Sequence, residues 1–409
     1  MQVYIGIDWS EEKHDVIFMN RAGADLLSLT IPHSLDGFVQ LDTARREMGL
    51  APEDCLIGLE TAHNLLIDYL WSQDYSQVYV LPPNQVKSNR GRFRQSQAKD
   101  DPTDARLIAD ILRTDRGRLQ PWHPDQLLTR QIRAKVSLIL HLSKQTTRLS
   151  NRLRAVLLRY YPAALQVFTG GLKTLIAPQF VLAYPSPQAA QALTYAEFES
   201  FAQTQRYPNP KKLPGCFVRL QANYPPASSD MILVYQNEAE LLARLLLENS
   251  RAKVKALADL QHLYRQHPNY ATFASLPGMG KLIGPGQLAK FGDDPQRFPH
   301  PSSVQALAGT CPVTSRSSKR RTVKFRRSCD KEWRHLCHQW AMALVHKSRS
   351  PIAMAYYERI RPHCHSNSHA YRCLANRWLA VAWKLWQTGQ TYDQAYHFQQ
   401  RTARSKPRG

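Results

Sequence analysis

The sequence predicts an α/β N-terminal domain with a mixed sheet, joined through long helices that form a coiled coil to a mainly α-helical C-terminal domain. Three observations support this fold class. Short apolar strands alternate with helical segments near the N-terminus, two long amphipathic stretches occupy the middle of the chain, and helical spacing dominates the rest. The 409 residues, of which 43% are hydrophobic, are enough for two folded units with their own cores.

Short apolar runs in the first region, residues 1–122, predict β-strands at Val3–Asp8, His14–Met19, Cys55–Glu60 and Gln77–Leu81. The first two runs are close enough in the chain to form a hairpin. We expect helices over residues 34–48 and 64–72. A third helix is expected to begin near Pro102, because proline is tolerated in the first turn of a helix.

The second region, residues 123–268, contains two long helical stretches, at about 127–160 and 231–267, with a small helical insert between them. Antiparallel pairing of the long helices would return the chain to its starting point. The first long helix is rich in arginine. This composition is consistent with a face that meets phosphate and equally with an ordinary solvated amphipathic helix.

The third region, residues 269–390, begins with a glycine-rich turn at Leu276–Gly280, followed by Gly284 and Gly286. Such a turn at the start of a helix can present backbone N–H groups to a phosphate. A short helix is expected from Ser303, ended by glycine and proline. The basic tail at residues 391–409 is expected to be disordered.

The charge of the chain points to a polyanionic partner. Lys and Arg number 54 against 32 Asp and Glu, which gives a formal net charge of +22. Nucleic acid is the partner that such a field most often serves, although a ribosome-like scaffold or another binder of anionic surfaces can have the same composition. Basic residues of one polar stretch are candidate nucleic-acid contacts: Lys87, Arg90, Arg92, Arg94 and Lys99.

No apolar run approaches the ~20 residues that a membrane span needs, and no signal-peptide pattern is present. We therefore expect a cytoplasmic, nucleoid-associated protein without membrane contact. The seven cysteines are odd in number and never form a Cys-x-x-Cys pair, which favours reduced thiols. One segment concentrates thiols and imidazoles, but its spacing fits no standard zinc finger, so the sequence does not favour a zinc site there. Its residues are His363, Cys364, His365, His369 and Cys373.

Four carboxylates are candidates for a catalytic metal site. Asp8 and Glu60 each end an apolar strand, whereas Asp101 and Asp104 lie three residues apart at the start of a helix and so share one face. Carboxylates gathered in this way suit Mg²⁺, which prefers oxygen ligands and keeps positions open for phosphate oxygens. Each acid alone could equally be exposed to solvent or complement a helix dipole. Neighbouring acids that we leave out are Asp15, Asp68, Asp100 and Asp110.

A basic segment rich in serine follows Pro312. Its serines are Ser315, Ser317 and Ser318, and its cations are Arg316, Lys319, Arg320, Arg321, Lys324, Arg326 and Arg327. Guanidinium groups beside a serine neutralise a phosphate and favour the alkoxide, which suits a nucleophile that attacks DNA. On residue chemistry alone, a basic DNA-contacting loop whose serines only bond phosphates is the favoured interpretation.

Together these segments resemble the insertion-element transposases in which an acidic DEDD domain is joined to a serine-bearing transposase domain. The DEDD domain is similar to RuvC-like Holliday-junction resolvases, which have an RNase H-like fold. The matching motifs keep the family's order along nearly the whole chain. They are Ile5–Asp8, Leu59–Thr61, Asn84–Lys87, Lys99–Arg106, Leu276–Gly280 and Ala308–Pro312 with the serines that follow.

The resemblance implies that Asp8, Glu60, Asp101 and Asp104 hold Mg²⁺ and that Ser317 forms a covalent phosphoserine link with DNA. It also implies that the acids and the serine form one composite centre between subunits of a homo-oligomer, a dimer or a tetramer. A structured noncoding bridge RNA would then select donor and target DNA.

Two departures from the family pattern affect these assignments. Ser318 stands where the family usually has glycine, so Ser315 and Ser318 stay as lesser candidates for the nucleophile. Asp100 stands where the family usually has threonine, although the spacing to Asp104 favours Asp101.

Three functions follow from these alternatives. The leading hypothesis is a DNA transposase or site-specific recombinase that uses both the acids and the serine. The second is a metal-dependent endonuclease, similar to Holliday-junction resolvases, that hydrolyses DNA without Ser317. The third is a non-catalytic nucleic-acid-binding protein, which would need none of the acids.

Overall fold

The computed structural model describes residues 2–60, 65–90, 101–168, 170–317 and 320–405, without the side chains of residues 101–103, 320–321 and 401–405. The chain divides into two compact units, residues 1–124 and 125–409. The second unit contains both the long helices and the C-terminal region, which the sequence suggested as separate domains.

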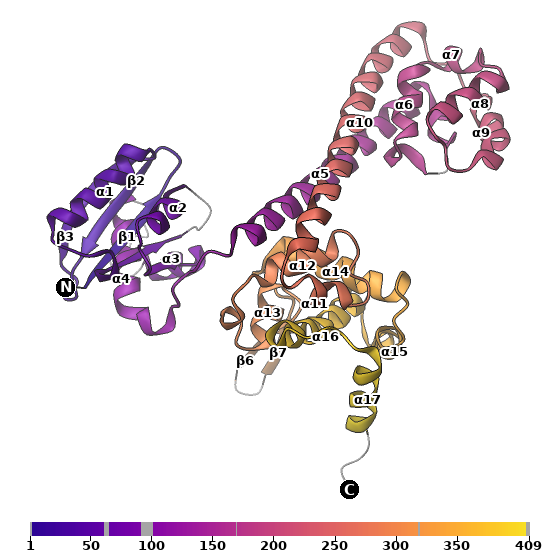
Figure 1. Ribbon diagram of the computed structural model, residues 1–409. Helices are drawn as coiled ribbons and strands as arrows, with labels where there is room; N and C mark the ends of the chain where they lie inside the picture. The colour runs from indigo at the N-terminus through magenta and orange to yellow at the C-terminus, as the bar shows by residue number, and fades with distance from the viewer. Residues whose placement is uncertain (1, 61–64, 91–100, 169, 318–319, 406–409) are drawn as a thin grey trace. The chain divides into compact units, whose positions relative to one another are not determined.

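The first unit is built on a mixed sheet of five strands in the order β3-β2-β1-β4-β5 (Figure 1). The strands are β1 (Val3–Trp9), β2 (Lys13–Met19), β3 (Asp25–Pro32), β4 (Cys55–Leu59) and β5 (Val78–Val80). β2 is antiparallel to both β1 and β3, whereas β1–β4 and β4–β5 are parallel pairs. The predicted mixed sheet and its first hairpin are confirmed. β3 was not predicted, because this edge strand is largely exposed and has no continuous buried run.

Helices cover both faces of this sheet, because successive side chains of a strand point to opposite faces. The helices of the first unit are α1 (Leu35–Glu47), α2 (Leu65–Ser72), α3 (Pro83–Asn89) and α4 (Asp101–Asp115). α1 and α2 pack on the face that carries Ile5 and Ile7. α4 packs on the opposite face, against Tyr4 and Leu56.

Two long helices of the second unit run antiparallel along each other. They are α5 (Leu127–Tyr160) and α10 (Ser229–Gln266). Later residues of α5 contact earlier residues of α10, since Lys135 pairs with Asp259 whereas Arg152 pairs with Glu238. The antiparallel pairing predicted from the sequence is therefore confirmed.

A polar contact lies near the middle of this helix pair. Asn249 Nδ2 of α10 donates to the Leu142 carbonyl at 3.0 Å and to the Thr146 hydroxyl at 2.8 Å. Thr146 is buried, so these hydrogen bonds satisfy polar groups that water does not reach freely.

Among the helices in the described ranges, none has the length and apolarity needed to cross a bilayer.

The helical insert expected between the long helices is present, and it has its own core. Its main helices are α6 (Ile176–Ala183), α7 (Pro187–Gln191), α8 (Tyr195–Thr204) and α9 (Leu213–Leu220). Phe168, Phe180 and Phe198 are buried against one another and against the ends of α5 and α10.

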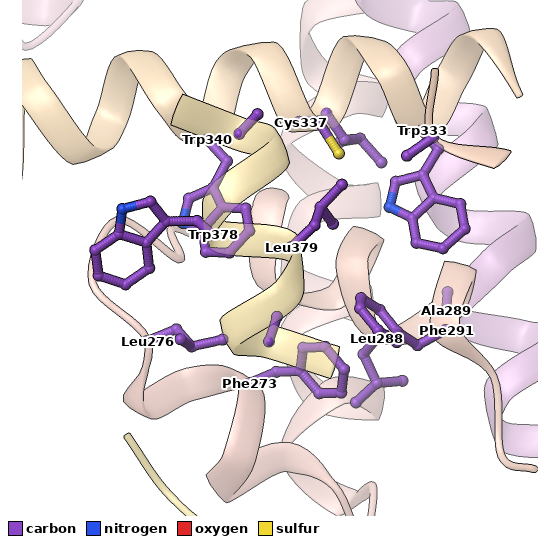
Figure 2. Close-up of a cluster of buried hydrophobic side chains, with 14 of the residues drawn as sticks. Phe273, Leu276, Leu288, Ala289, Phe291, Trp333, Cys337, Trp340, Trp378 and Leu379 are labelled. Carbon is purple, nitrogen blue, oxygen red and sulfur yellow. The ribbon is translucent and has the colours of Figure 1, made fainter. Parts of the chain in front are cut away.

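The C-terminal region packs its helices around a large aromatic core. These helices are α11 (Tyr270–Ser275), α12 (Ile283–Phe291), α13 (Pro301–Leu307), α14 (Lys331–His346), α15 (Pro351–Ile360) and α16 (Asn367–Thr388). Figure 2 shows three tryptophans of this core, Trp333, Trp340 and Trp378. The Trp333 indole N–H donates to Gln287 Oε1 at 2.8 Å, so its burial leaves no unsatisfied donor.

Two glycines that follow the glycine-rich turn serve the packing of the C-terminal region. Gly284 and Gly286 are buried in α12. A Cβ at Gly284 would lie 2.8 Å from the Tyr264 hydroxyl, and one at Gly286 would lie 2.8 Å from a methyl group of Leu336. The glycines therefore allow α12 to approach α10 and α14 closely.

Two elements of the C-terminal region differ from the sequence-based expectation. The basic serine segment forms a hairpin of β6 (Val313–Ser317) and β7 (Arg320–Lys324). The tail expected to be disordered contains α17 (Gln394–Ser405). Its start is fixed because Asp393 accepts from the Tyr396 N–H at 3.0 Å and His397 packs edge-on against Trp378.

Candidate active site

Asp8 and Glu60 lie at the same end of two neighbouring parallel strands. Asp8 is near the end of β1, and Glu60 directly follows β4. The register pairs Gly6 with Gly58 and Ile7 with Leu59, so the next residues, Asp8 and Glu60, lie side by side. Alternation along the strands puts both carboxylates on the face that carries the two glycines. Both residues are half-buried.

The same face receives α4, and the two glycines set how closely it approaches. A Cβ at Gly6 would lie 2.0 Å from the Ala105 carbonyl oxygen, and one at Gly58 would lie 2.9 Å from Ile108. α4 is antiparallel to β1, because its later residues Ala109 and Leu112 lie near Tyr4 while Ala105 lies near Gly6. The N-terminal end of α4 therefore points to the strand ends that carry Asp8 and Glu60.

Asp104 precedes Ala105 and lies one helical turn before Ile108, at the end of α4 nearest to these carboxylates. Its side chain is 7% exposed. Asp101 is the first residue of α4, and its side chain lies outside the described part of the structure. The fold thus brings Asp8, Glu60 and Asp104 to one edge and one face of the sheet.

Arg90 holds the Asp104 carboxylate through two hydrogen bonds. Arg90 Nε donates to Oδ1 at 3.1 Å, and Nη2 donates to Oδ2 at 2.6 Å. Arg90 follows the last residue of α3, so this ion pair joins α3 to the start of α4. A basic residue expected to contact nucleic acid is therefore engaged within the acidic site, with its side chain 26% exposed.

Asp15, which the sequence-based interpretation left out, lies directly opposite Asp8 on β2. Its Oδ1 accepts a hydrogen bond from the Thr30 hydroxyl at 2.5 Å. The hairpin was predicted, but its register was not, and the register decides that these two acids are neighbours. Asp68 and Asp110 belong to α2 and α4, respectively, and Asp110 pairs with Arg113.

The donor set at this edge suits a hard divalent cation. Asp8, Glu60 and Asp104 offer carboxylate oxygens, without a thiol or imidazole among them. Mg²⁺ prefers such ligands and uses one or two carboxylates together with water and phosphate oxygens. The close approach of α4 over Gly6 and Gly58 puts Asp104 at the same end of the sheet as Asp8 and Glu60, and oxygen donors of this kind fit a metal-assisted phosphoryl-transfer site.

Ser317 is the last residue of β6 and is exposed. It pairs with Arg320, while Ser315 pairs with Thr322 two residues further along the same face of the hairpin. Ser318 lies outside the described residues, so the structure does not test it as a nucleophile. Ser317 belongs to the second unit and the four acids to the first.

The remaining basic candidates are placed as follows. Lys87 is exposed on α3, Arg316 on β6 and Lys324 on β7, whereas Arg326 donates to the Cys311 carbonyl at 3.3 Å and Arg327 is exposed. Arg92, Arg94, Lys99 and Lys319 lie outside the described residues, as do the side chains of Arg320 and Arg321.

A cationic cavity of about 1000 Å³ lies between α5, α14 and α16. The basic residues that line it are Lys144, Arg148, Lys331, Arg334 and Arg372. The guanidinium groups of Arg334 and Arg372 lie 5.1 and 4.8 Å from the ring centre of Phe325, which directly follows β7. We call this cavity the basic groove. The sequence did not disclose it, because its cations come from three helices far apart in the chain.

Comparison with known proteins places these features in a family. Residues 5–162 match the family model of the IS110-type DEDD transposase domain, and residues 270–358 match that of the IS116/IS110/IS902 transposase family. The first match contains the acidic edge, and the second contains the serine hairpin, α14 and most of α15.

Whole-length relatives agree with both matches. The mini-circle protein of Streptomyces coelicolor assigned as the transposase for IS117 is 29% identical over 97% of this chain and 97% of its own length. The 42 kDa protein of insertion element IS900 from Mycobacterium paratuberculosis is 25% identical over 96% of this chain and 98% of its own length. The 44.8 kDa protein of insertion element IS116 from Streptomyces clavuligerus is 24% identical over 94% of both chains.

The two domain matches follow one another in the order of the chain and together cover more than half of it. On these grounds the chain belongs to the IS116/IS110/IS902 family of insertion-element transposases.

Proposed function

We propose that this transposase cleaves and rejoins DNA strands at its insertion element through a Mg²⁺-bound acidic site and a covalent phosphoserine intermediate at Ser317. The observation that supports the proposal best is the position of Asp8, Glu60 and Asp104 at the same end and on the same face of the sheet. The five-stranded mixed sheet with helices on both faces is consistent with a RuvC-like, RNase H-like nuclease domain.

The proposed metal ligands are Asp8, Glu60, Asp101 and Asp104. Bound Mg²⁺ would supply Lewis-acid stabilisation of the charge that develops on the phosphate oxygens. Arg90 orients Asp104, because its guanidinium pairs with both carboxylate oxygens. In this proposal, Arg90 is a positioning residue rather than a nucleic-acid contact.

Ser317 is proposed to exchange one ester bond for another. Its Oγ forms a bond to phosphorus while the bond from phosphorus to a sugar oxygen breaks, and the released sugar oxygen gains a proton as the serine loses one. A sugar hydroxyl of the second strand then attacks the phosphoserine and restores the serine hydroxyl. Because ester bonds are conserved, strand exchange needs neither ATP nor water.

The proposed assembly is a homo-oligomer in which the acids of one subunit and the serine of another form one centre. We propose a structured noncoding RNA as a further partner that selects donor and target DNA. The net charge of +22 supports binding of more than one nucleic-acid strand. Sequencing the nucleic acid that copurifies with the full chain tests this partner, and finding no RNA from the element would contradict it.

The serine step is tested with full-length protein, its copurified nucleic acid and DNA that carries the element ends. Ser317→Ala should abolish strand exchange and the protein–DNA adduct that survives denaturing electrophoresis. Ser315→Ala is the matched control, because Ser315 lies on the same face of the same strand, and it should retain both products. An adduct at the wild-type level with Ser317→Ala would remove Ser317 from the mechanism.

A second candidate function is hydrolysis of branched DNA, as in Holliday-junction resolvases. The location of Asp8, Glu60 and Asp104 within the first unit favours this candidate, because a site made of these acids needs no residue of the second unit. It predicts that Asp8→Asn abolishes cleavage of a four-way junction while Ser317→Ala leaves cleavage and its hydrolysed ends unchanged.

A further inference from the structure

We propose that Cys364, His369 and Cys373 bind a zinc ion that joins the loop after α15 to α16. The ligand atoms of these three residues lie within 4.8 Å of one another, although the sequence spacing gave no reason to expect a zinc site. This inference is independent of the proposed function, because it concerns residues remote from both the acids and Ser317 in the chain.

Two of the three ligands are arranged by helix geometry alone. His369 and Cys373 lie four residues apart on α16, so their side chains occupy the same face one turn apart. The helix begins in a fixed position, because Ser366 Oγ accepts from the His369 backbone N–H at 3.2 Å. The pair therefore forms a preorganised half of a metal site.

The third ligand is brought to this face by the loop. Cys364 follows the short 3₁₀ helix Arg361–His363, and the Arg361 guanidinium donates to the Cys364 carbonyl at 3.1 Å and to Asn367 Oδ1 at 2.5 Å. These contacts tie the loop to the first turn of α16. The sequence missed the site because this loop closure, and not a recurrent finger spacing, sets the geometry.

The donor set selects zinc over the hard cations proposed for the acidic edge. Two thiolates and one imidazole are soft and borderline ligands, and zinc accepts them in tetrahedral sites. Zinc–sulfur bonds of about 2.3 Å put two thiolate sulfurs about 3.8 Å apart in a tetrahedron. A cluster whose atoms lie within 4.8 Å needs only small side-chain rotations to reach this geometry.

The site is accessible enough to load and to keep a fourth ligand from solvent. Cys364, His369 and Cys373 are each half-buried. His365 stacks on His369 with ring centres 5.9 Å apart, which limits the rotation of the His369 ring. We assign the fourth position to water.

The place of the site gives it a structural role. Arg372, which lies over the Phe325 ring at 4.8 Å, directly precedes Cys373 on α16. Zinc would fix the first turns of α16 and thereby the wall of the basic groove that Arg372 contributes. We therefore expect metal loss to loosen the segment around residues 361–373 before the rest of the core.

The test is metal analysis of untagged full-length protein purified without chelator. Wild type should contain about one zinc per chain, and its Co²⁺-substituted form should show the near-ultraviolet charge-transfer absorption of thiolate–cobalt bonds. Cys364→Ser and Cys373→Ser should each lose most of the zinc and weaken this absorption. Cys311→Ser is the control, because Cys311 is another half-buried thiol outside the cluster, and it should keep both.

A readout on wild type alone guards against misfolded variants. Chelation should expose two additional thiols to a thiol-reactive probe, with helical circular dichroism largely retained, and zinc should reverse the change. Absence of zinc together with absence of the cobalt band would overturn the proposal. A Cys364–Cys373 disulfide in freshly purified protein, detected by mass spectrometry before reduction, would overturn it as well.

Discussion

Arg90 and Asp104 form a two-point ion pair at the acidic edge of the first unit, with donor–acceptor distances of 3.1 and 2.6 Å. The carboxylate is buried, and the guanidinium occupies one lone pair on each of its oxygens. An oxygen of a carboxylate has a second lone pair, so Asp104 can bind a cation while it remains paired with Arg90. The pair therefore stabilises the charge of Asp104 when metal is absent.

Removing Arg90 should make the thermal stability of the first unit depend on Mg²⁺. Arg90→Gln leaves a buried carboxylate without its cation, so the free energy of unfolding without metal should fall by about 1–3 kcal/mol. Mg²⁺ should then raise the melting temperature more in Arg90→Gln than in wild type. Arg113→Gln is the control, since Arg113 makes a similar pair with Asp110 elsewhere on α4. If Mg²⁺ raised the melting temperature equally in all three proteins, Asp104 would not be a metal ligand.

Gly6 should tolerate no side chain. A Cβ there would lie 2.0 Å from the Ala105 carbonyl and 2.6 Å from the Ala109 nitrogen, so Gly6→Ala must displace α4 or the strand. We expect a loss of at least about 1–3 kcal/mol in the free energy of unfolding and loss of DNA cleavage. Gly117→Ala has no atom within 4 Å of its new Cβ and should be neutral. Calorimetry of both variants checks this difference, and a neutral Gly6→Ala would contradict the described packing.

The first unit should lose stability as the pH falls below neutrality. Burial and the neighbouring His33 lower the pKa of His14 from 6.5 to about 4, although Asp15 opposes the shift. The unfolded chain thus takes up a proton at a higher pH than the folded chain does. The contribution of neutral His14 to the free energy of unfolding is fully present above about pH 6.5. It falls by up to about 3 kcal/mol as the pH decreases toward 4, and it changes no further below that pH.

His14→Gln checks this assignment, because it removes the titrating group. The calorimetric transition of the first unit is the one that shifts in Gly6→Ala. In His14→Gln, the temperature of this transition should depend less on pH between 6.5 and 4 than in wild type. An unchanged slope would assign the pH dependence to other groups.

The basic groove should contribute to nucleic-acid affinity through phosphate contacts. Lys144 and Arg148 are exposed on α5 and line the groove. Replacing both by alanine should weaken DNA binding in fluorescence anisotropy titrations, and the slope of log affinity against log salt should become shallower by about 2. Arg251→Ala, an exposed α10 residue paired with Glu248, is the control. A salt slope equal to that of wild type would exclude the groove from the binding surface.

The strands of the first unit could be predicted because β1, β2 and β4 are continuous apolar runs with buried residues. The position of α4 could not be predicted, because it depends on the close packing of Gly6 and Gly58 against a helix that lies about 50 to 100 residues later in the chain. The positions of the acids at strand ends and at a helix start could therefore be predicted, but the neighbouring placement of Asp8 and Glu60 needed the sheet register. Asp15 was missed for the same reason.

The serine hairpin was harder to predict from its composition. All five residues of β6 are exposed, so the strand has no buried face to produce a hydrophobic alternation. The segment 361–373 was equally hidden, because its thiols and imidazole converge through contacts of Arg361 rather than through a regular spacing.

The antiparallel pair α5–α10 sets a fixed span within the second unit. Ile132 belongs to the C-terminal core and Val156 to the core of the insert, and the 24 residue steps from one to the other along α5 rise roughly 36 Å. Sliding one helix past the other by a turn would break both hydrogen bonds of the Asn249 amide, so a single alignment is favoured. The helix pair therefore keeps the two cores at a fixed separation. A nucleic acid that contacts both ends of the pair would have to span that length.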